Sequence, residues 1–398
     1  MSTRFTKLAG AAFFAVTLVL PLVYYLVINP IFTKPNTFED GQGYLDSAQR
    51  LLATGSPYQD WQLAGPYGAV TATDTFRYPP PFAQFAALFV RTGTGSLLLA
   101  TLVVTCFLAP LVLARSRREA ALALWLGLAF VPNYIAAWEG QVTGLLTIAV
   151  AFALCEFPAA IWAGAALKVT PILALPAAIM RMPRMVAAQA IVLLPLLAAS
   201  VIASPIAWAQ FPAVLVNEFL GGTDYESLAP AGPARIAVLA VVGASLLASL
   251  ALARRRWPLA LYLAVAAGLL LPGFLPKYAL PVLVPFLFVG LRDSQARMWS
   301  LLAFFPLSLP FTSFSAPVFV GLGLLGMSMW RLESESIDWR PPWGALRTRR
   351  SLRTILSQAG RFNDWVKTQF VGDCGSSSAA WADAEGSAPG LRLRSARP

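Results

Sequence analysis

The chain has 398 residues, of which 57% are hydrophobic and only 12% charged, and its net charge is +11. A soluble domain has about twice this proportion of charged residues, so the composition excludes an ordinary water-soluble protein. The sequence contains no histidine, which excludes any histidine-based triad, relay or metal site. Its three cysteines lack the spacing of a disulfide or zinc site. Successive apolar runs of about 20 residues predict an all-α integral membrane protein with a multi-span helical bundle.

Eleven apolar runs are predicted to be membrane spans. The first follows two basic residues, is long for a signal peptide and lacks a convincing cleavage site, so we expect it to remain as a signal anchor. The runs lie at about 8–29, 95–114, 119–137, 141–157, 159–180, 185–203, 234–252, 258–272, 278–291, 297–312 and 315–330.

Arginine clusters set the predicted orientation, because cytoplasmic loops are enriched in Lys and Arg. The clusters at 115–118, 254–256 and 292–297 fall on the same side as the N-terminus. The loops 30–80 and 204–233 then lie outside, and the second contains acids but no Lys or Arg. Because the cations sit between apolar runs, we expect the lipid bilayer, and not nucleic acid, to be the partner of this basic chain.

Arg181 and Arg184 do not follow this orientation, because a complete crossing by residues 159–180 would place them outside. Lys168 lies within that run and Pro171 follows it, so a broken or re-entrant helix would return the arginines to the cytoplasm. A miscounted neighbouring span is the competing interpretation, and the sequence leaves both open.

The last segment, residues 331–398, differs in composition from the rest of the chain. It is rich in Arg, Ser and Gly, which predicts a cytoplasmic and largely disordered basic tail. Residues 1–330 are expected to form one transmembrane domain in the plasma (inner) membrane.

The loop after the first span contains a short amphipathic pattern. Apolar residues recur at helical spacing from Tyr44, and Gly55 ends the pattern, which predicts a juxtamembrane helix on the outer membrane surface. Asp40 immediately precedes this helix and would suit its N-cap. The other aspartates of the loop are expected to be solvated surface charges: Asp46, Asp60 and Asp74.

Several cations and tyrosines occur where the chain enters or crosses the apolar region. Arg77 beside Tyr78, in a Phe-Arg-Tyr-Pro-Pro-Pro-Phe stretch, would bind a phosphate at the headgroup level or act as an interfacial anchor. The same two interpretations apply to Lys277 and Tyr278 at the external end of a later span. Lys168 inside an apolar run faces a cavity or a partner, or else extends to the surface.

A polar Glu-Gly-Gln turn, Glu139 to Gln141, connects two apolar runs at the outer face, and a simple connection would explain it. Together, these segments place a carboxylate, Asp40 or Glu39, and several cations at one face of the membrane. This combination suits sugar transfer from a lipid phosphate. The carboxylate would remove a proton from an acceptor hydroxyl, and the cations would stabilise the departing phosphate.

The stretch "DGQGYLDSAQRLLATGSPY", Asp40 to Tyr58, resembles the Asp-x-x-x-Tyr…Ala…Leu-Leu…Gly…Pro-Tyr signature of the polyprenol-phosphate-mannose-dependent α-mannosyltransferases. These are membrane glycosyltransferases with the GT-C fold. The segments "FRYPP", "EGQVTGLL" and "AALKVTP" follow in that family's order. They match its Phe-x-Tyr-Pro-Pro, Asn-Gly-Gln and Leu-Lys-x-x-Pro patterns. The likeness covers about residues 8–330 and leaves the tail outside.

The resemblance implies an inverting hexosyltransferase, with mannose as the expected sugar and no metal or other cofactor. A polyprenyl-phosphate sugar would be the donor, and an extracytoplasmic glycan or glycolipid the acceptor. Carried over by position, Asp40 is the catalytic base. The donor phosphate is assigned to Arg77, Lys168 and Lys277. Substrate contacts are expected from Glu39, Tyr44, Tyr78, Glu139, Gln141 and Tyr278.

The chain also departs from the family's pattern. Glu139 stands where the family usually has Asn, and the late external loop reads "LPGFLPKYALP" without the family's Ser-Pro-x-x-Trp run and histidine. These differences leave the sugar and the acceptor open. The alternative functions are a transporter or flippase of lipid-linked sugars, for which no inverted repeat is visible, and a non-catalytic assembly partner.

Overall fold

The computed structural model describes residues 15–19, 21, 23, 38–64, 76–221, 233–272, 275–308 and 316–332. All regular structure in these ranges is helical, which confirms the predicted all-α class. Most of the first predicted span, Asp74 and the tail beyond Leu332 lie outside the described residues.

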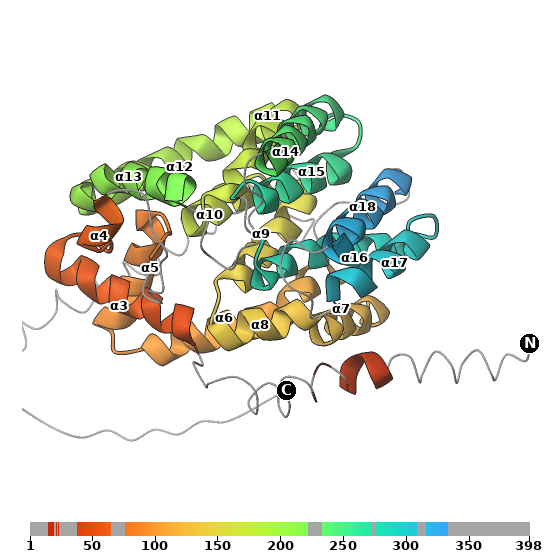
Figure 1. Ribbon diagram of the computed structural model, residues 1–398, viewed down its shortest axis with the longest axis horizontal. Helices are drawn as coiled ribbons and strands as arrows, with labels where there is room; N and C mark the ends of the chain where they lie inside the picture. Colours follow the sequence, from red (N-terminus) through yellow and green to blue (C-terminus); the bar gives the residue numbers. More distant parts are fainter. Residues whose placement is uncertain are drawn as a thin grey trace, which may run out of the picture. The chain divides into compact units, whose positions relative to one another are not determined.

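The elements follow one another in a single series of helices with short connections (Figure 1). In chain order they are α3 (Glu39–Thr54), α4 (Asp60–Leu63), α5 (Pro80–Arg91), α6 (Gly95–Leu108), η2 (Ala109–Leu113), α7 (Arg117–Ala129), α8 (Val131–Glu139), α9 (Thr143–Leu154), α10 (Ala159–Leu167), η3 (Thr170–Ala174), α11 (Leu175–Arg181), α12 (Pro183–Ala203), α13 (Pro205–Gly221), α14 (Pro233–Leu252), α15 (Trp257–Leu270), η4 (Lys277–Leu283), α16 (Val284–Arg292), α17 (Arg297–Ser308) and α18 (Ala316–Arg331).

Fewer helices than predicted are long enough to cross a membrane. Within the described ranges, three segments have the necessary length and apolar character: Gly95–Leu113, Pro183–Ala203 and Arg235–Leu252. The pair α7 and α8 makes a fourth if the two are counted as one bent span. The structure thus supports a membrane protein, while several of the predicted spans correspond to shorter apolar helices.

Prolines explain the shorter helices, since a proline has no N–H to donate and interrupts a helix. The predicted span 119–137 corresponds to two helices, because the chain turns by 65° between α7 and α8, where Pro132 lies in the first turn of the second helix. The predicted break at Lys168 is confirmed. Lys168 is extended, with φ −153° and ψ 136°, and separates α10 from η3.

Helix α9 lies in the middle of the packed helices, against α6, α10, η4 and α16 (Figure 1). Gly144 in its first turn allows the close contact with α6, because a Cβ there would lie only 2.5 Å from the backbone nitrogen of Cys106. Small residues permit such approaches between membrane helices. The first turn of α9 is therefore packed closely against α6.

Helix α3 begins at Glu39, earlier than predicted, and its N-cap is Phe38. The prediction that Asp40 caps this helix is therefore wrong. Gly55 ends the helix as expected, with φ 80°. Asp40 precedes Tyr44 by one helical turn, so both lie on the face of α3 that is buried against α5. This apolar face, expected on the membrane surface, is covered by protein.

The start of α3 is attached to the end of α8. The Phe38 N–H donates to the carbonyl of Trp138 over 2.8 Å. Gly140, with φ 69°, ends α8, and a Cβ on it would lie 3.1 Å from the Cα of Gly41. Two glycines thus let the backbones touch and place Asp40 beside the turn between α8 and α9.

Helix α13 occupies most of the segment predicted as the loop 204–233, of which residues 222–232 lie outside the described part. It packs on α4, and the side-chain amide of Asn217 donates to the carbonyl of Gln62 over 2.8 Å. Ser56 donates to the Gln210 side chain over 2.5 Å. The segment 38–64 is thereby held by α13 as well as by α5.

Replacing Gly140 by Ala should destabilise the protein by about 1–3 kcal/mol. Alanine is strained in the left-handed backbone conformation of this position, and its Cβ would press on Gly41. The control is Gly43→Ala in α3, where a Cβ meets nothing within 4 Å and helix propensity improves by about 1 kcal/mol. Thermal unfolding in detergent should show a lower melting temperature for Gly140→Ala alone. Equal melting temperatures would argue against this contact.

Candidate functional site

Gln141, fully buried in the turn before α9, connects the polar residues of three segments. Its Nε2 donates to Oδ2 of Asp40. Its Oε1 accepts from the hydroxyls of Tyr44 (3.0 Å) and Tyr78 (3.2 Å), which are 2.8 Å apart. Because the hydroxyl protons need an acceptor, the tyrosines orient the amide with its NH₂ toward Asp40.

The segment that carries Arg77 and Tyr78 is held at several points. The Tyr58 hydroxyl donates to the carbonyl of Tyr78 over 2.9 Å, and the Gln62 amide donates to the carbonyl of Phe76 over 3.1 Å. The ring of Tyr78 also packs edge-on against Tyr44, with ring centres 5.0 Å apart. These contacts set the position of Arg77 relative to α3.

Asp40 interacts electrostatically with two cations, Arg77 and Lys168, and with the neighbouring acid Glu39. Burial raises the pKa of Asp40 to about 6, and the charge of Glu39 adds to this increase. The two cations and the hydrogen bond from Gln141 act in the opposite direction but do not cancel it. A carboxyl group that titrates near neutral pH is suited to act as a general base.

Two further predicted residues border this carboxylate. Glu139, the last residue of α8, interacts with Asp40 and with the side chain of Gln141. Tyr278, in η4, interacts with Asp40, Tyr78 and Arg77. Because η4 packs against α8 and α9, segments far apart in the sequence converge on one place.

The structure therefore brings most of the predicted site residues into one polar cluster around Asp40. Lys277 is half-buried at the first position of η4, next to Tyr278, and its contact with a phosphate stays a prediction. Asp60 is exposed, as expected. The members of the cluster are Glu39, Asp40, Tyr44, Arg77, Tyr78, Glu139, Gln141, Lys168 and Tyr278.

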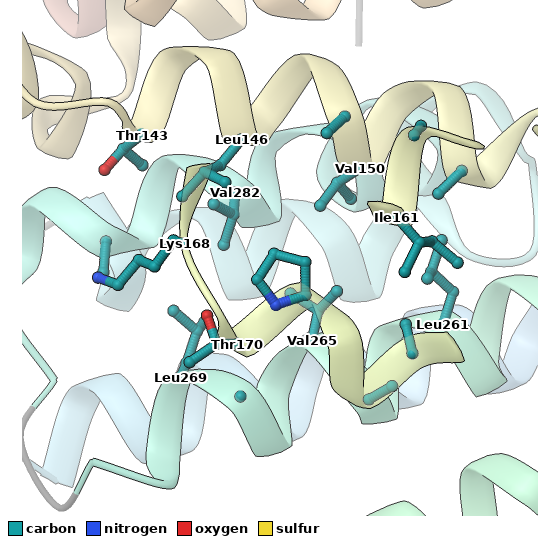
Figure 2. Close-up of a pocket in the computed structure, with 18 residues that line it drawn as sticks. Thr143, Leu146, Val150, Ile161, Lys168, Thr170, Leu261, Val265, Leu269 and Val282 are labelled. Atoms are coloured by element: carbon teal, nitrogen blue, oxygen red, sulfur yellow. The ribbon is translucent and has the colours of Figure 1, made fainter. Parts of the chain in front are cut away.

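A narrow apolar cavity of about 60 Å³ begins at Lys168. Figure 2 shows Lys168 and Thr143 at one end of it, and Ile161 and Leu261 at the other. Thr143 opens α9, so a cation and the free N–H groups of a helix N-terminus meet at the polar end. Thr143 was not among the site residues predicted from the sequence, although Thr143 lies in the "EGQVTGLL" segment.

A wider apolar groove of about 380 Å³ lies among α5, α10, α12 and α13. Val169 and Pro79 line it, and their sequence neighbours Lys168 and Tyr78 belong to the polar cluster. The groove is thus lined in part by residues adjacent in sequence to members of the polar cluster. No sequence pattern predicted this groove, because its lining residues come from separate helices. They include Pro81, Trp162, Leu194, Leu197, Trp208 and Phe211.

Arginines gather at the other end of α9. Glu156, just beyond this end, pairs with Arg181 over 2.8 Å, and Arg181 also donates to the carbonyl of Arg254. Arg292 pairs with Glu119 over 2.8 Å and interacts with Cys155. Since α9 has 12 residues and is about 18 Å long, the arginine end and the Asp40 cluster are separate.

No family model, curated protein or solved structure matches this chain. The site is therefore interpreted from its own geometry. In the part of the chain that the structure describes, no group of three or more His, Cys, Asp or Glu is arranged to hold a metal ion. The cluster combines a half-buried carboxylate with two cations, and residues adjacent to it in sequence line an apolar groove, which suits a lipid carrying an anionic headgroup.

Replacing Arg77 by Gln should raise the pKa of Asp40 further, because it removes a cation that stabilises the carboxylate. Infrared difference spectra of the carboxyl band, with Asp40→Asn as reference, would give this pKa directly. The wild type should titrate near pH 6 and the variant at higher pH. Arg91→Gln, at an exposed arginine in α5, is the control and should leave the titration unchanged. A wild-type midpoint below pH 5 would contradict the description of the site.

Proposed function

We propose that the protein is a GT-C-type hexosyltransferase that uses a polyprenyl-phosphate sugar, with mannose as the expected hexose. The observation that carries the proposal is the position of Asp40. Its carboxylate is half-buried and interacts with Arg77 and Lys168, and the apolar groove is lined by Pro79 and Val169, the sequence neighbours of Tyr78 and Lys168. A base, a phosphate-binding site and a lipid-binding groove are the three parts that such a transfer requires.

The reaction is a single displacement. Asp40 takes the proton of an acceptor hydroxyl, whose oxygen attacks the anomeric carbon of the donor sugar. The bond between that carbon and the phosphate oxygen breaks, and its electron pair leaves with the polyprenyl phosphate. Because attack occurs opposite to the leaving group, the anomeric configuration inverts.

Each group has a defined task in this step. Gln141 engages Oδ2 of Asp40, so Oδ1 is available to accept the proton. Arg77 and Lys168 stabilise the negative charge that develops on the departing phosphate. Thr143 and the N-terminus of α9 lie on the Lys168 side and favour the same charge.

The groove suits the polyprenyl chain of the donor. It is lined almost entirely by apolar side chains, among them Val169, which follows Lys168 in the chain. A phosphate held by Lys168 would place its attached chain in this groove. The exposed apolar face of α12 beside it is typical of a surface in contact with lipid.

The arginine end of α9 supports an extracytoplasmic site in the plasma membrane. Arg181, Arg254 and Arg292 gather there, and Lys and Arg accumulate on the cytoplasmic side of membrane proteins. The Asp40 cluster lies at the opposite end of α9. The acceptor would then be a glycan or glycolipid outside the cytoplasm.

Replacing Asp40 by Asn should lower the transfer rate by about 100-fold or more, because the acceptor loses its base. The assay follows radiolabelled sugar from polyprenyl-phosphate mannose into a covalent product, with the amount of folded protein measured in parallel. Asp60→Asn, at an exposed aspartate, is the matched control and should be fully active. Near-normal transfer by Asp40→Asn, or label that only changes leaflet, would overturn the proposal.

The pH dependence of kcat/KM should follow the ionisation of Asp40. Burial raises the pKa of Asp40 to about 6, and only the deprotonated form accepts a proton. Activity should therefore fall tenfold per pH unit below pH 6 and level off above it. A flat profile between pH 5 and 7 would exclude Asp40 as the base.

Replacing Leu194 by Trp should fill the groove and raise the KM for a long-chain donor by about 10-fold. A donor with a ten-carbon prenyl chain, too short to fill the groove, should be affected much less. Val192→Trp is the matched control, because Val192 lies on the same helix, is exposed to a similar extent (61% against 54%) and does not line the groove. Equal effects on long and short donors would exclude the groove as the lipid site.

A further inference from the structure

Glu139 is a half-buried acid, and one of its carboxyl oxygens lacks a hydrogen-bond partner in the described part of the chain. It ends α8, immediately before the left-handed Gly140, and faces the Asp40 cluster. Its Oε2 is buried and has no hydrogen-bond partner in the described part of the chain. A buried carboxyl oxygen without a partner lowers the stability of the folded state, so a partner from outside the protein would be favourable.

The surroundings of Glu139 differ from those of Asp40. Asp40 is opposed by two cations, whereas the charges that act most strongly on Glu139 are the acids Asp40 and Glu39. Glu139 is therefore poorly placed to hold the anionic phosphate of the donor. Its environment suits a neutral ligand that brings a hydroxyl group.

The geometry relates Glu139 to the acceptor side of the reaction. Gln141 donates to Asp40, and its side chain also bonds to Glu139, so the two carboxyl groups flank one amide. In the proposed transfer, the reacting hydroxyl lies at Asp40. Because one amide contacts both carboxyl groups, a hydroxyl bound by Glu139 would lie close to the reacting one and would belong to the same acceptor.

We infer that Glu139 binds a hydroxyl adjacent to the reacting one, and that the acceptor is consequently a sugar or another vicinal diol. The inference rests on the proposed function and names its acceptor class. A serine or threonine side chain has a single hydroxyl and would leave Glu139 unpaired. A site rejects an analogue that lacks one hydroxyl because the buried polar group that would bind this hydroxyl is left unpaired.

The test removes the two partners of this hydrogen bond separately and together. The probes are octyl α-mannoside, octyl β-glucoside, the monodeoxy series of the better acceptor, and a serine-containing peptide. In the wild type, the deoxy analogue that lacks the hydroxyl next to the reacting one should lose about 10- to 100-fold in kcat/KM. In Glu139→Met this penalty should disappear, because the hydroxyl has lost its partner.

Two other variants separate binding from a structural effect. Glu139→Gln still offers a hydrogen bond and should retain part of the penalty. Asp46→Asn, at the surface of α3, should retain all of it. If Glu139 only supported Gln141, Glu139→Met would slow transfer to every acceptor and the deoxy penalty would persist.

Each outcome is informative. A penalty that is unchanged in Glu139→Met, the lack of any deoxy penalty in the wild type, or transfer to the peptide alone would overturn the role of Glu139. Transfer to none of the probes would count against the proposed transferase itself. The failure of this inference and the failure of the proposed function can thus be distinguished.

Discussion

The hydrogen bond from Gln141 to Asp40 is the interaction on which the arrangement of the site depends. It links the first turn of α3 to the turn before α9, two segments about a hundred residues apart. Tyr44 and Tyr78 fix the orientation of the amide, and the Gly41–Gly140 contact allows the backbones to approach. Burial, which raises the pKa of Asp40, is a consequence of the same packing.

The two cations near Asp40 come from different segments of the chain, and different contacts position each of them. Arg77 is positioned by the hydrogen bonds of Tyr58 and Gln62 to its neighbours, and Lys168 by the break between α10 and η3. At this break the N–H of Lys168 still donates to the carbonyl of Gly164 over 2.8 Å. The Lys168 side chain lies at the polar end of the narrow cavity, and the next residue, Val169, lines the groove.

The structure bears on two questions that the sequence left open: whether Asp40 caps α3, and whether the segment before Arg181 is one continuous helix. Asp40 does not cap α3, since Phe38 holds that position, and its carboxylate is directed into the protein. The segment before Arg181 is broken, because α10, η3 and α11 replace one continuous helix, while the cytoplasmic position of Arg181 stays a prediction. Arg181 then lies beside Arg254, in the arginine group that the positive-inside rule expects.

The sequence by itself determined the membrane class, the helical fold and the polar residues of the site, because these follow from composition, hydrophobic runs and residue chemistry. It also offered a break at Lys168 as one of two interpretations, since a charge and a proline interrupt an apolar run. Only the tertiary structure decided that 119–137 bends at Phe130, that α13 packs on α4, and that an apolar groove lies among α5, α10, α12 and α13. A hydropathy profile does not predict these features, because they arise from contacts between helices that are distant in the chain.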